Sequence, residues 1–172
     1  MLMHAEWAGR EVIEGAVVLD VFAGTGALGL EALSRGAASA CFIERDAAAL
    51  RALRANVAAC KAEDRVEVVA EDVFSVGGRR GVFLQSRRIA EAGERKPVSL
   101  LDGALASLVF LDPPYGQELV PRAIARLSEA GRIATGALIV AETGRDEIWV
   151  PKQPLLVERH HGVARMIVFR AN

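Results

Sequence analysis

The segment "LVFLDPPYG", residues 108–116, joins a short apolar run to an acid, two prolines and an aromatic residue. Proline cannot donate a hydrogen bond to a sheet, and a carboxylate at the end of a buried strand is costly unless it is used. Asp112 offers one acceptor, and the Pro113 carbonyl offers a second acceptor on backbone of restricted φ. The ring of Tyr115 offers a flat face on which a base could stack. Together these groups could hold an amino group carried by an aromatic ring.

A second segment, "DVFAGTGALG" at residues 20–29, contains Gly24, Gly26 and Gly29 in the spacing G-x-G-x-x-G. Such glycines permit a tight turn, close approach of the backbone to a ligand, and close packing of the following helix. Glu44 lies 20 residues after Gly24, where an acid can accept the hydroxyl hydrogens of an adenosine ribose. The pattern fits a nicotinamide cofactor nearly as well as S-adenosylmethionine, and glycines also close turns for purely structural reasons.

Two further acids favour S-adenosylmethionine over a dinucleotide. Asp20 ends the first apolar run, where it would repel a pyrophosphate and attract the ammonium group of a methionine. Asp72 follows a later apolar run and is placed to reach an adenine amino group; its alternative role is that of a helix cap or a turn acid. A P-loop is excluded because no Gly-Lys-Ser/Thr follows the glycines.

With S-adenosylmethionine in the glycine loop, the segment around Asp112 would lie beside the transferable methyl group. The Asp112 carboxylate and the Pro113 carbonyl could then hold the two N–H groups of an exocyclic amine on a nucleobase. Such a base must be flipped or unpaired, and Tyr115 would stack on it. The alternative for the tetrapeptide is an ordinary turn, since Asp-Pro and Pro-Pro are common turn formers.

The elements that must position these residues alternate along the chain. Apolar, β-branched runs predict strands at 16–22, 39–44, 65–72, 107–112 and 137–143. Segments of helical spacing predict helices at 26–37, 45–60 and 118–131, the last one interrupted near its start by Pro121. Residues 155–161 and 163–170 flank Gly162 and predict an antiparallel hairpin. The alternation predicts an α/β protein in one domain, residues 1–172, with helices on both faces of a parallel sheet.

The composition of the chain argues against several other classes of protein. The chain has 172 residues, enough for a sizeable core, and a net charge of −1 that does not indicate nucleic-acid binding by itself. No apolar run reaches the roughly 18 residues of a membrane helix, and no signal peptide is evident, so we expect no membrane association. Cys41 and Cys60 form no metal-like pair, which indicates a reduced, cytoplasmic setting. His160 and His161 lack further ligands, so we expect no metal.

One basic segment, residues 76–97, breaks the alternation of strands and helices. It is either a solvated helix on an insertion or a local contact to nucleic acid. Its charges are Arg79, Arg80, Arg87, Arg88, Arg95 and Lys96 against Glu91 and Glu94.

The segments "VLDVFAGTGALGLEALSRGA", "FIERD" and "VFLDPPYG" together resemble the bacterial 16S ribosomal RNA guanine-N2 methyltransferases of the small subunit methyltransferase D type. The resemblance extends from about Val12 to the final hairpin. It implies a Rossmann-like class I S-adenosylmethionine-dependent methyltransferase with a mostly parallel seven-stranded sheet and a C-terminal antiparallel hairpin. It also implies S-adenosylhomocysteine as the product and, as substrate, a guanine in ribosomal RNA or in a small-subunit assembly intermediate. We expect the protein to be a monomer.

The resemblance assigns roles to residues that match the family's motifs. Family members carry a basic segment before the first strand, and here "MLMHAEWAGRE" resembles the end of a helix preceding that strand, as expected for a shortened chain. The implied cofactor-binding residues are Asp20, Phe22, Ala23, Gly24, Thr25, Gly26, Glu44 and Asp72, and the implied catalytic residues are Asp112, Pro113, Pro114 and Tyr115.

Several alternatives remain open at this stage. An adenine-N6 methyltransferase would use the same four residues, so the choice of guanine rests on the resemblance alone. A glutamine-directed protein methyltransferase is disfavoured because that group has Asn where this chain has Asp112. An NAD-dependent dehydrogenase could use the glycine loop but would leave the Asp-Pro-Pro-Tyr segment unexplained. A non-catalytic module that binds only cofactor or protein is the last alternative.

Overall fold

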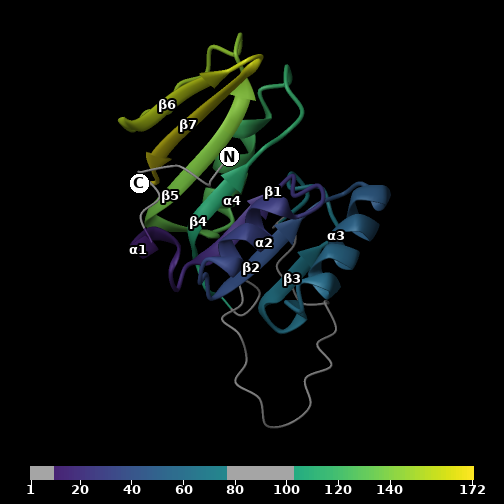
Figure 1. Ribbon diagram of the computed structural model, residues 1–172. Helices are drawn as coiled ribbons and strands as arrows, with labels where there is room; N and C mark the ends of the chain where they lie inside the picture. The colour runs from purple at the N-terminus through teal and green to yellow at the C-terminus, as the bar shows by residue number, and fades with distance from the viewer. Residues whose placement is uncertain (1–9, 77–102) are drawn as a thin grey trace.

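The computed structural model describes residues 10–76 and 103–172 (Figure 1). The first nine residues and residues 77–102 lie outside the described part. The predicted basic segment 76–97 therefore falls almost entirely outside it, as does most of the N-terminal segment.

Seven strands form one sheet in the order β3-β2-β1-β4-β5-β7-β6 (Figure 1). The five strands β1 to β5 pair in parallel, whereas β7 is antiparallel to both β5 and β6. This arrangement confirms the predicted mostly parallel sheet with a C-terminal antiparallel hairpin. The strand bounds are Val17–Val21 (β1), Ser39–Ile43 (β2), Val66–Val69 (β3), Ala106–Leu111 (β4), Ile133–Gly144 (β5), Leu155–His161 (β6) and Ala164–Arg170 (β7).

The described helices, except the first, connect parallel strands, as the sequence pattern predicts, and the first precedes β1. They are α1 (Arg10–Ile13), α2 (Ala27–Ser34), α3 (Ala47–Ala59) and α4 (Leu119–Glu129), with a 3-10 turn at Glu63–Arg65. The predicted interruption at Pro121 is wrong, because Pro121 is the third residue of α4. The first turn of a helix has no intrahelical acceptors for its N–H groups, so a proline there removes no helical bond. Within the described residues, no helix has the length and apolar character needed to cross a membrane.

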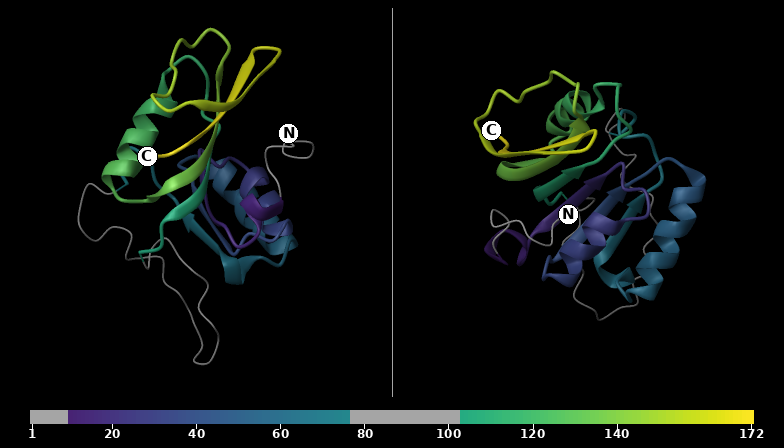
Figure 2. Two further views of the ribbon diagram at one scale, coloured as in Figure 1. Left: turned by 90° about the vertical axis from the view of Figure 1, so that its left-hand side faces the viewer. Right: turned by 45° about the horizontal axis from the view of Figure 1, so that its top comes forward.

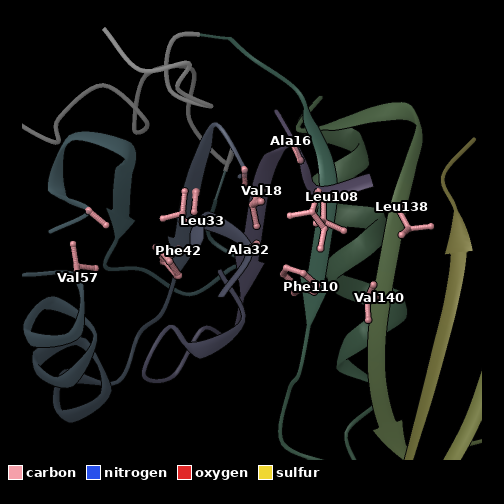
Figure 3. Packing of buried hydrophobic residues seen from close by; sticks show 14 of the residues in the cluster. Ala16, Val18, Ala32, Leu33, Phe42, Val57, Leu108, Phe110, Leu138 and Val140 are labelled. Atoms are coloured by element: carbon pink, nitrogen blue, oxygen red, sulfur yellow. The ribbon is translucent and has the colours of Figure 1, made fainter. Parts of the chain in front are cut away.

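Both faces of the central strands β1, β2 and β4 are buried, which explains why these strands are continuous apolar runs. Val18, Phe42, Phe110 and Val140 point to the face covered by α2 and α3 (Figure 3). Their neighbours along the strands point to the opposite face, which α4 covers through Val120, Ala123 and Leu127. Figure 2 shows α4 and α2 on opposite sides of the sheet. The predicted helices on both faces are confirmed.

The strand order reverses between β1 and β4, and this reversal positions the candidate site. From β1 the chain crosses over to β2 on one side, while β4 lies on the other side of β1. The loops that leave the carboxyl ends of these two neighbouring strands therefore separate. Open parallel sheets bind ligands in the crevice that forms at such a point.

Gly29 allows α2 to lie directly on β2. A Cβ at this position would lie 2.4 Å from Cε1 and 2.7 Å from Cζ of the fully buried Phe42 ring. We expect Gly29→Ala to lower the free energy of unfolding by about 2 kcal/mol, because overpacking a core outweighs the gain in helix propensity. Urea denaturation would measure the loss. Phe42→Leu in the same chain should restore part of it, and a Gly29→Ala protein as stable as the wild type would contradict this packing.

Candidate active site

A cavity of about 1130 Å³ opens at the carboxyl edge of the sheet, where β1 and β4 part. Its walls come from the loops after four parallel strands and from the start of α4. The lining residues are Phe22, Gly24, Ile43, Glu44, Arg45, Asp46, Glu71, Asp72, Val73, Phe74, Asp112, Pro113, Pro114, Tyr115, Gln117, Leu119 and Arg122. The structure thus brings the predicted Phe22, Gly24, Glu44 and Asp72 to the same cavity as the Asp-Pro-Pro-Tyr segment.

The loop after β1 has an unusual backbone at the cavity wall. Phe22 has φ of +61°, a left-handed conformation that a bulky residue rarely adopts, and Gly24 has φ of +54°. A Cβ on Gly24 would meet nothing closer than the Phe22 carbonyl at 4.0 Å, so the glycine is needed for its backbone and not for packing. Strained conformations of this kind occur where a loop is held for a ligand.

The other predicted residues of this loop do not line the cavity. A Cβ on Gly26 would lie 2.3 Å from Cδ1 of Leu53, so this glycine lets the loop pack beneath α3. The Ala23 N–H donates to the carbonyl of Ile43 at 3.1 Å, and the Thr25 carbonyl accepts from Asn56 Nδ2 at 3.0 Å. These contacts bind the loop to its neighbours. The ligand contacts expected of Ala23, Thr25 and Gly26 stay predictions.

Asp20 lies beneath the loop and away from the cavity wall. Its side chain is buried, and Oδ2 accepts a hydrogen bond from the Gly29 N–H at 2.9 Å. Because the N-cap of α2 is Gly26, which has no side chain, Asp20 supplies the acceptor for the first turn of that helix. Burial raises the pKa of Asp20 to about 7, with smaller contributions from the charges of Asp112 and Glu44 and an opposing one from the Gly29 hydrogen bond. This position supports a structural role, and the contact to a methionine ammonium remains a prediction.

Glu44 is held rigidly at the rim of the cavity. Its Oε2 accepts from the Gly24 N–H at 2.8 Å, and its Oε1 accepts from the N–H groups of Arg45 and Asp46, both at 2.7 Å. The carboxylate therefore connects the loop after β1 to the loop after β2. Asp46 in turn caps α3 by accepting from the N–H groups of Ala48 and Ala49.

Asp72 forms the turn contact that the sequence left as an alternative, and it also lines the cavity. Its Oδ1 accepts from the Phe74 N–H at 3.0 Å, and its Oδ2 pairs with Arg45 Nη1 at 2.5 Å. The Arg122 guanidinium lies 4.5 Å from the centre of the Phe74 ring. Arg45 and Arg122 are the cationic side chains of the cavity wall, and each already contacts another side chain of the protein.

The Asp-Pro-Pro-Tyr segment begins directly after β4 and lines the cavity together with Phe22 and Gly24 of the glycine loop. Asp112 forms no hydrogen bond or ion pair with any residue in 10–76 or 103–172. Its pKa is raised above the usual value, first by partial burial and second by the negative charge of Glu142. Pro113 is buried, whereas Pro114 and Tyr115 are exposed at the cavity. An unpartnered carboxylate with a raised pKa in a cleft is typical of a functional site.

Two glutamates support this segment and were missed by the sequence analysis. The Tyr115 hydroxyl donates to Glu142 Oε1, and this bond raises the pKa of Tyr115 to about 12. Glu147 Oε1 accepts from the N–H groups of Gly116 at 2.7 Å and Gly144 at 3.2 Å. The sequence could have indicated Glu142, because this acid lies near the carboxyl end of an apolar strand, as Asp112 does. No sequence pattern indicated Glu147, which lies in a polar loop.

The strand order and the cavity at the reversal point define a class of protein. The chain has the Rossmann-like fold of class I S-adenosylmethionine-dependent methyltransferases. It belongs to the family described as Conserved hypothetical protein 95, whose model matches residues 3–82 and 84–167.

Individual relatives agree with this assignment. The chain is 38% identical over 132 residues to ribosomal RNA small subunit methyltransferase D of Escherichia coli, a match that covers 77% of this chain and 55% of that protein. The Escherichia coli protein yhhF has a solved structure that superposes with a TM-score of 0.73 at 32% identity, covering 95% of this chain and 79% of that one. An RNA methyltransferase of Salinibacter ruber, solved with S-adenosylhomocysteine, shares the fold at 18% identity with a TM-score of 0.59 over 94% of this chain and 84% of that one. The chain thus spans little more than half the length of its Escherichia coli relative.

Proposed function

We propose that this protein transfers a methyl group from S-adenosylmethionine to the exocyclic N2 amine of a guanine in 16S ribosomal RNA. The proposal is supported chiefly by one observation, which is that Asp112, Pro113 and Tyr115 share a cavity with Gly24 and Glu44. Residues suited to hold an amine thus face residues suited to hold an adenosine. The name of the Escherichia coli relative supports ribosomal RNA of the small subunit as the substrate, free or in an assembly intermediate.

The residues of the cavity fit the adenosine part of the cofactor. Glu44 has one Oε2 lone-pair direction left after accepting from Gly24, which suits a ribose hydroxyl. Phe22 and Phe74 are apolar walls whose ring centres are 6.4 Å apart. Asp72 lines the same cavity, where an adenine amino group could donate to it.

The geometry disfavours a dinucleotide, which was the main rival from another class of enzyme. A pyrophosphate would need the N–H groups at the start of α2, yet one of these, Gly29, already donates to the buried Asp20. Among the described residues of the cavity wall it would also find no free cation, since Arg45 pairs with Asp72 and Arg122 lies over Phe74. The Asp-Pro-Pro-Tyr segment would again have no role.

The chain's own residues act mainly by positioning. When bound, S-adenosylmethionine supplies an activated methyl group, so the protein needs a well-oriented nucleophile more than a strong base. The Asp112 carboxylate and the Pro113 carbonyl accept from the two N–H groups of the amine, which favours a lone pair directed across the cavity. Tyr115 stacks on the base. Asp112, whose pKa is raised, can take up the proton that the amine releases after transfer.

The assignment of Glu44 to the cofactor can be tested by binding alone. We expect Glu44→Ala to weaken S-adenosylmethionine binding by about 10- to 100-fold, because one charged acceptor is lost and three N–H groups are released. Isothermal titration calorimetry would measure the affinity, with the exposed Glu63→Ala as the matched control. Equal affinity for both variants, or binding of NAD in preference to S-adenosylmethionine, would contradict the cofactor site.

The reaction itself is tested by mass spectrometry of ribosomal RNA nucleosides. RNA from cells that lack this protein, as naked 16S RNA and as small ribosomal particles, is incubated with the purified protein and S-adenosylmethionine. We expect N2-methylguanosine to appear only when the protein is added. The appearance of N6-methyladenosine instead, or no methylated nucleoside with either substrate, would refute the proposal.

A further inference from the structure

Asp112 lines the wall that is proposed to receive the base, and a second carboxylate, Glu142, lies next to it and is bonded to Tyr115 of the same wall. The last registered pairs of β4 and β5 are Phe110 with Val140 and Leu111 with Ala141. Asp112 and Glu142 follow these pairs, so they continue the face of the sheet to which Phe110 and Val140 belong. Like charges at neighbouring positions of two strands are unfavourable, and here the charge of Glu142 raises the pKa of Asp112. Neither carboxylate has a cationic partner among residues 10–76 and 103–172.

Glu142 is also fixed relative to the surface on which the base would stack. The Tyr115 hydroxyl donates to Glu142 Oε1, and Glu142 Oε2 has no hydrogen-bond partner in the described part of the chain. The Glu142 carboxylate is thus held at the hydroxyl end of the Tyr115 ring, within reach of the edge of a base that stacks on that ring. The two acids then face the base together, with Asp112 on the reacting amine and Glu142 beside it.

The ring positions next to the amine differ between guanine and adenine. The N2 amine of guanine is next to N1–H, which is a donor, and to N3, which is an acceptor. The N6 amine of adenine is next to N1 and N7, and both of these are acceptors. A carboxylate beside the amine can accept from the guanine N1–H, whereas it would repel adenine in either orientation, because acceptor would face acceptor.

We propose that Glu142 is a specificity-determining residue that selects guanine over adenine by accepting a hydrogen bond from N1–H. This inference rests on the proposed methyl transfer to a nucleobase and adds to it the group that chooses the base. It also explains why two carboxylates lie next to each other, since each accepts from a different N–H group of one guanine edge: Asp112 from the amine and Glu142 from N1–H.

The test compares Glu142→Gln with the matched variant Glu147→Gln, which alters a carboxylate bound to backbone in the next loop. A glutamine can present either its oxygen or its amino group to the base, so it should tolerate guanine and adenine alike. Methyl transfer is measured on 16S RNA that carries guanine, 2-aminopurine or adenine at the methylated position. The 2-aminopurine base keeps the exocyclic amine and replaces the N1–H donor with an acceptor.

A second readout does not depend on turnover. Fluorescence anisotropy measures how tightly the protein, saturated with S-adenosylhomocysteine, binds a single-stranded RNA with one guanine among uridines and its adenine counterpart. We expect the wild type and Glu147→Gln to prefer guanine in both measurements. Glu142→Gln should lower the ratio of guanine to 2-aminopurine activity, and of guanine to adenine binding, by about 10-fold or more.

Tyr115→Phe tests whether Glu142 selects the base itself or only holds the Tyr115 ring in place. It removes the hydroxyl donor but leaves the carboxylate, so we expect slower transfer with the preference for guanine retained. Unchanged base ratios in Glu142→Gln, with all rates lowered equally, would overturn the inference while leaving the proposed reaction intact. Methylation of adenine in preference to guanine by the wild type would overturn both.

Discussion

Asp112→Ala is expected to reduce methyl transfer to ribosomal RNA by about 1000-fold, because it removes the charged acceptor that orients the amine. Affinity for S-adenosylmethionine should change by less than about threefold, since Asp112 forms no hydrogen bond or ion pair with Gly24, Glu44 or Asp72, the residues assigned to the cofactor. Single-turnover transfer of a radioactive methyl group measures the first quantity, and calorimetry measures the second.

Asp112→Asn is the matched variant, since its amide oxygen can still accept one N–H and its loss of activity should be smaller.

The pH dependence of methyl transfer provides a separate readout for Asp112. Because the ionised carboxylate is the acceptor and its pKa is raised, wild-type activity should fall with decreasing pH at a higher pH than for an ordinary carboxyl. Glu142→Gln removes one cause of the shift, so it should move this acidic limb to lower pH. An Asp112→Ala protein with wild-type activity would refute the catalytic role.

Asp20→Asn is expected to make the protein more stable than the wild type at pH 8, by up to about 4 kcal/mol. The ordinary pKa of 3.8 applies to the unfolded chain, and burial raises the folded value to about 7. Between these values the folded state keeps a proton that the unfolded state has lost. Wild-type stability should therefore fall as pH rises from about 4 to about 7, whereas an asparagine does not titrate. Urea denaturation of both proteins between pH 4.5 and pH 8 would measure the difference.

Asp20→Ala separates the charge from the hydrogen bond. It cannot titrate either, but it leaves the Gly29 N–H without its acceptor, so it should be less stable than Asp20→Asn by about 1–2 kcal/mol at every pH. A stability difference between Asp20→Asn and the wild type that does not vary with pH would contradict the buried position.

Calorimetry on Asp20→Asn also tests the prediction from the sequence that Asp20 binds the cofactor. A large loss of S-adenosylmethionine affinity would favour a direct contact to the methionine ammonium.

The elements of this fold could be predicted because their signals are local. The central strands β1, β2 and β4 are apolar runs buried on both faces, and α2 and α3 show apolar residues at helical spacing between strands. Alternation then requires parallel strands with crossovers on the sheet faces. Pro121 was misread because a proline acts differently in the first turn of a helix than in its interior, and the start of α4 was not known from the sequence.

The sequence by itself determined the α/β fold class, through the alternation of strand and helix patterns along the chain. It also located the glycine loop and the segment from Asp112 to Tyr115, since these patterns depend on neighbours within a few positions. Only the tertiary structure decided which glycine of this loop lines the cavity: Gly24 does, whereas Gly26 and Gly29 pack against α3 and β2.

The tertiary structure also decided which acids act together. Asp20 points beneath the loop because it lies on the strand face covered by α2, and Glu142 meets Tyr115 because β5 lies next to β4 in register. Such pairings join residues 9 and 27 positions apart. Their contacts depend on strand order and on the face to which each side chain points, and neither of these is encoded in short-range patterns of residue types.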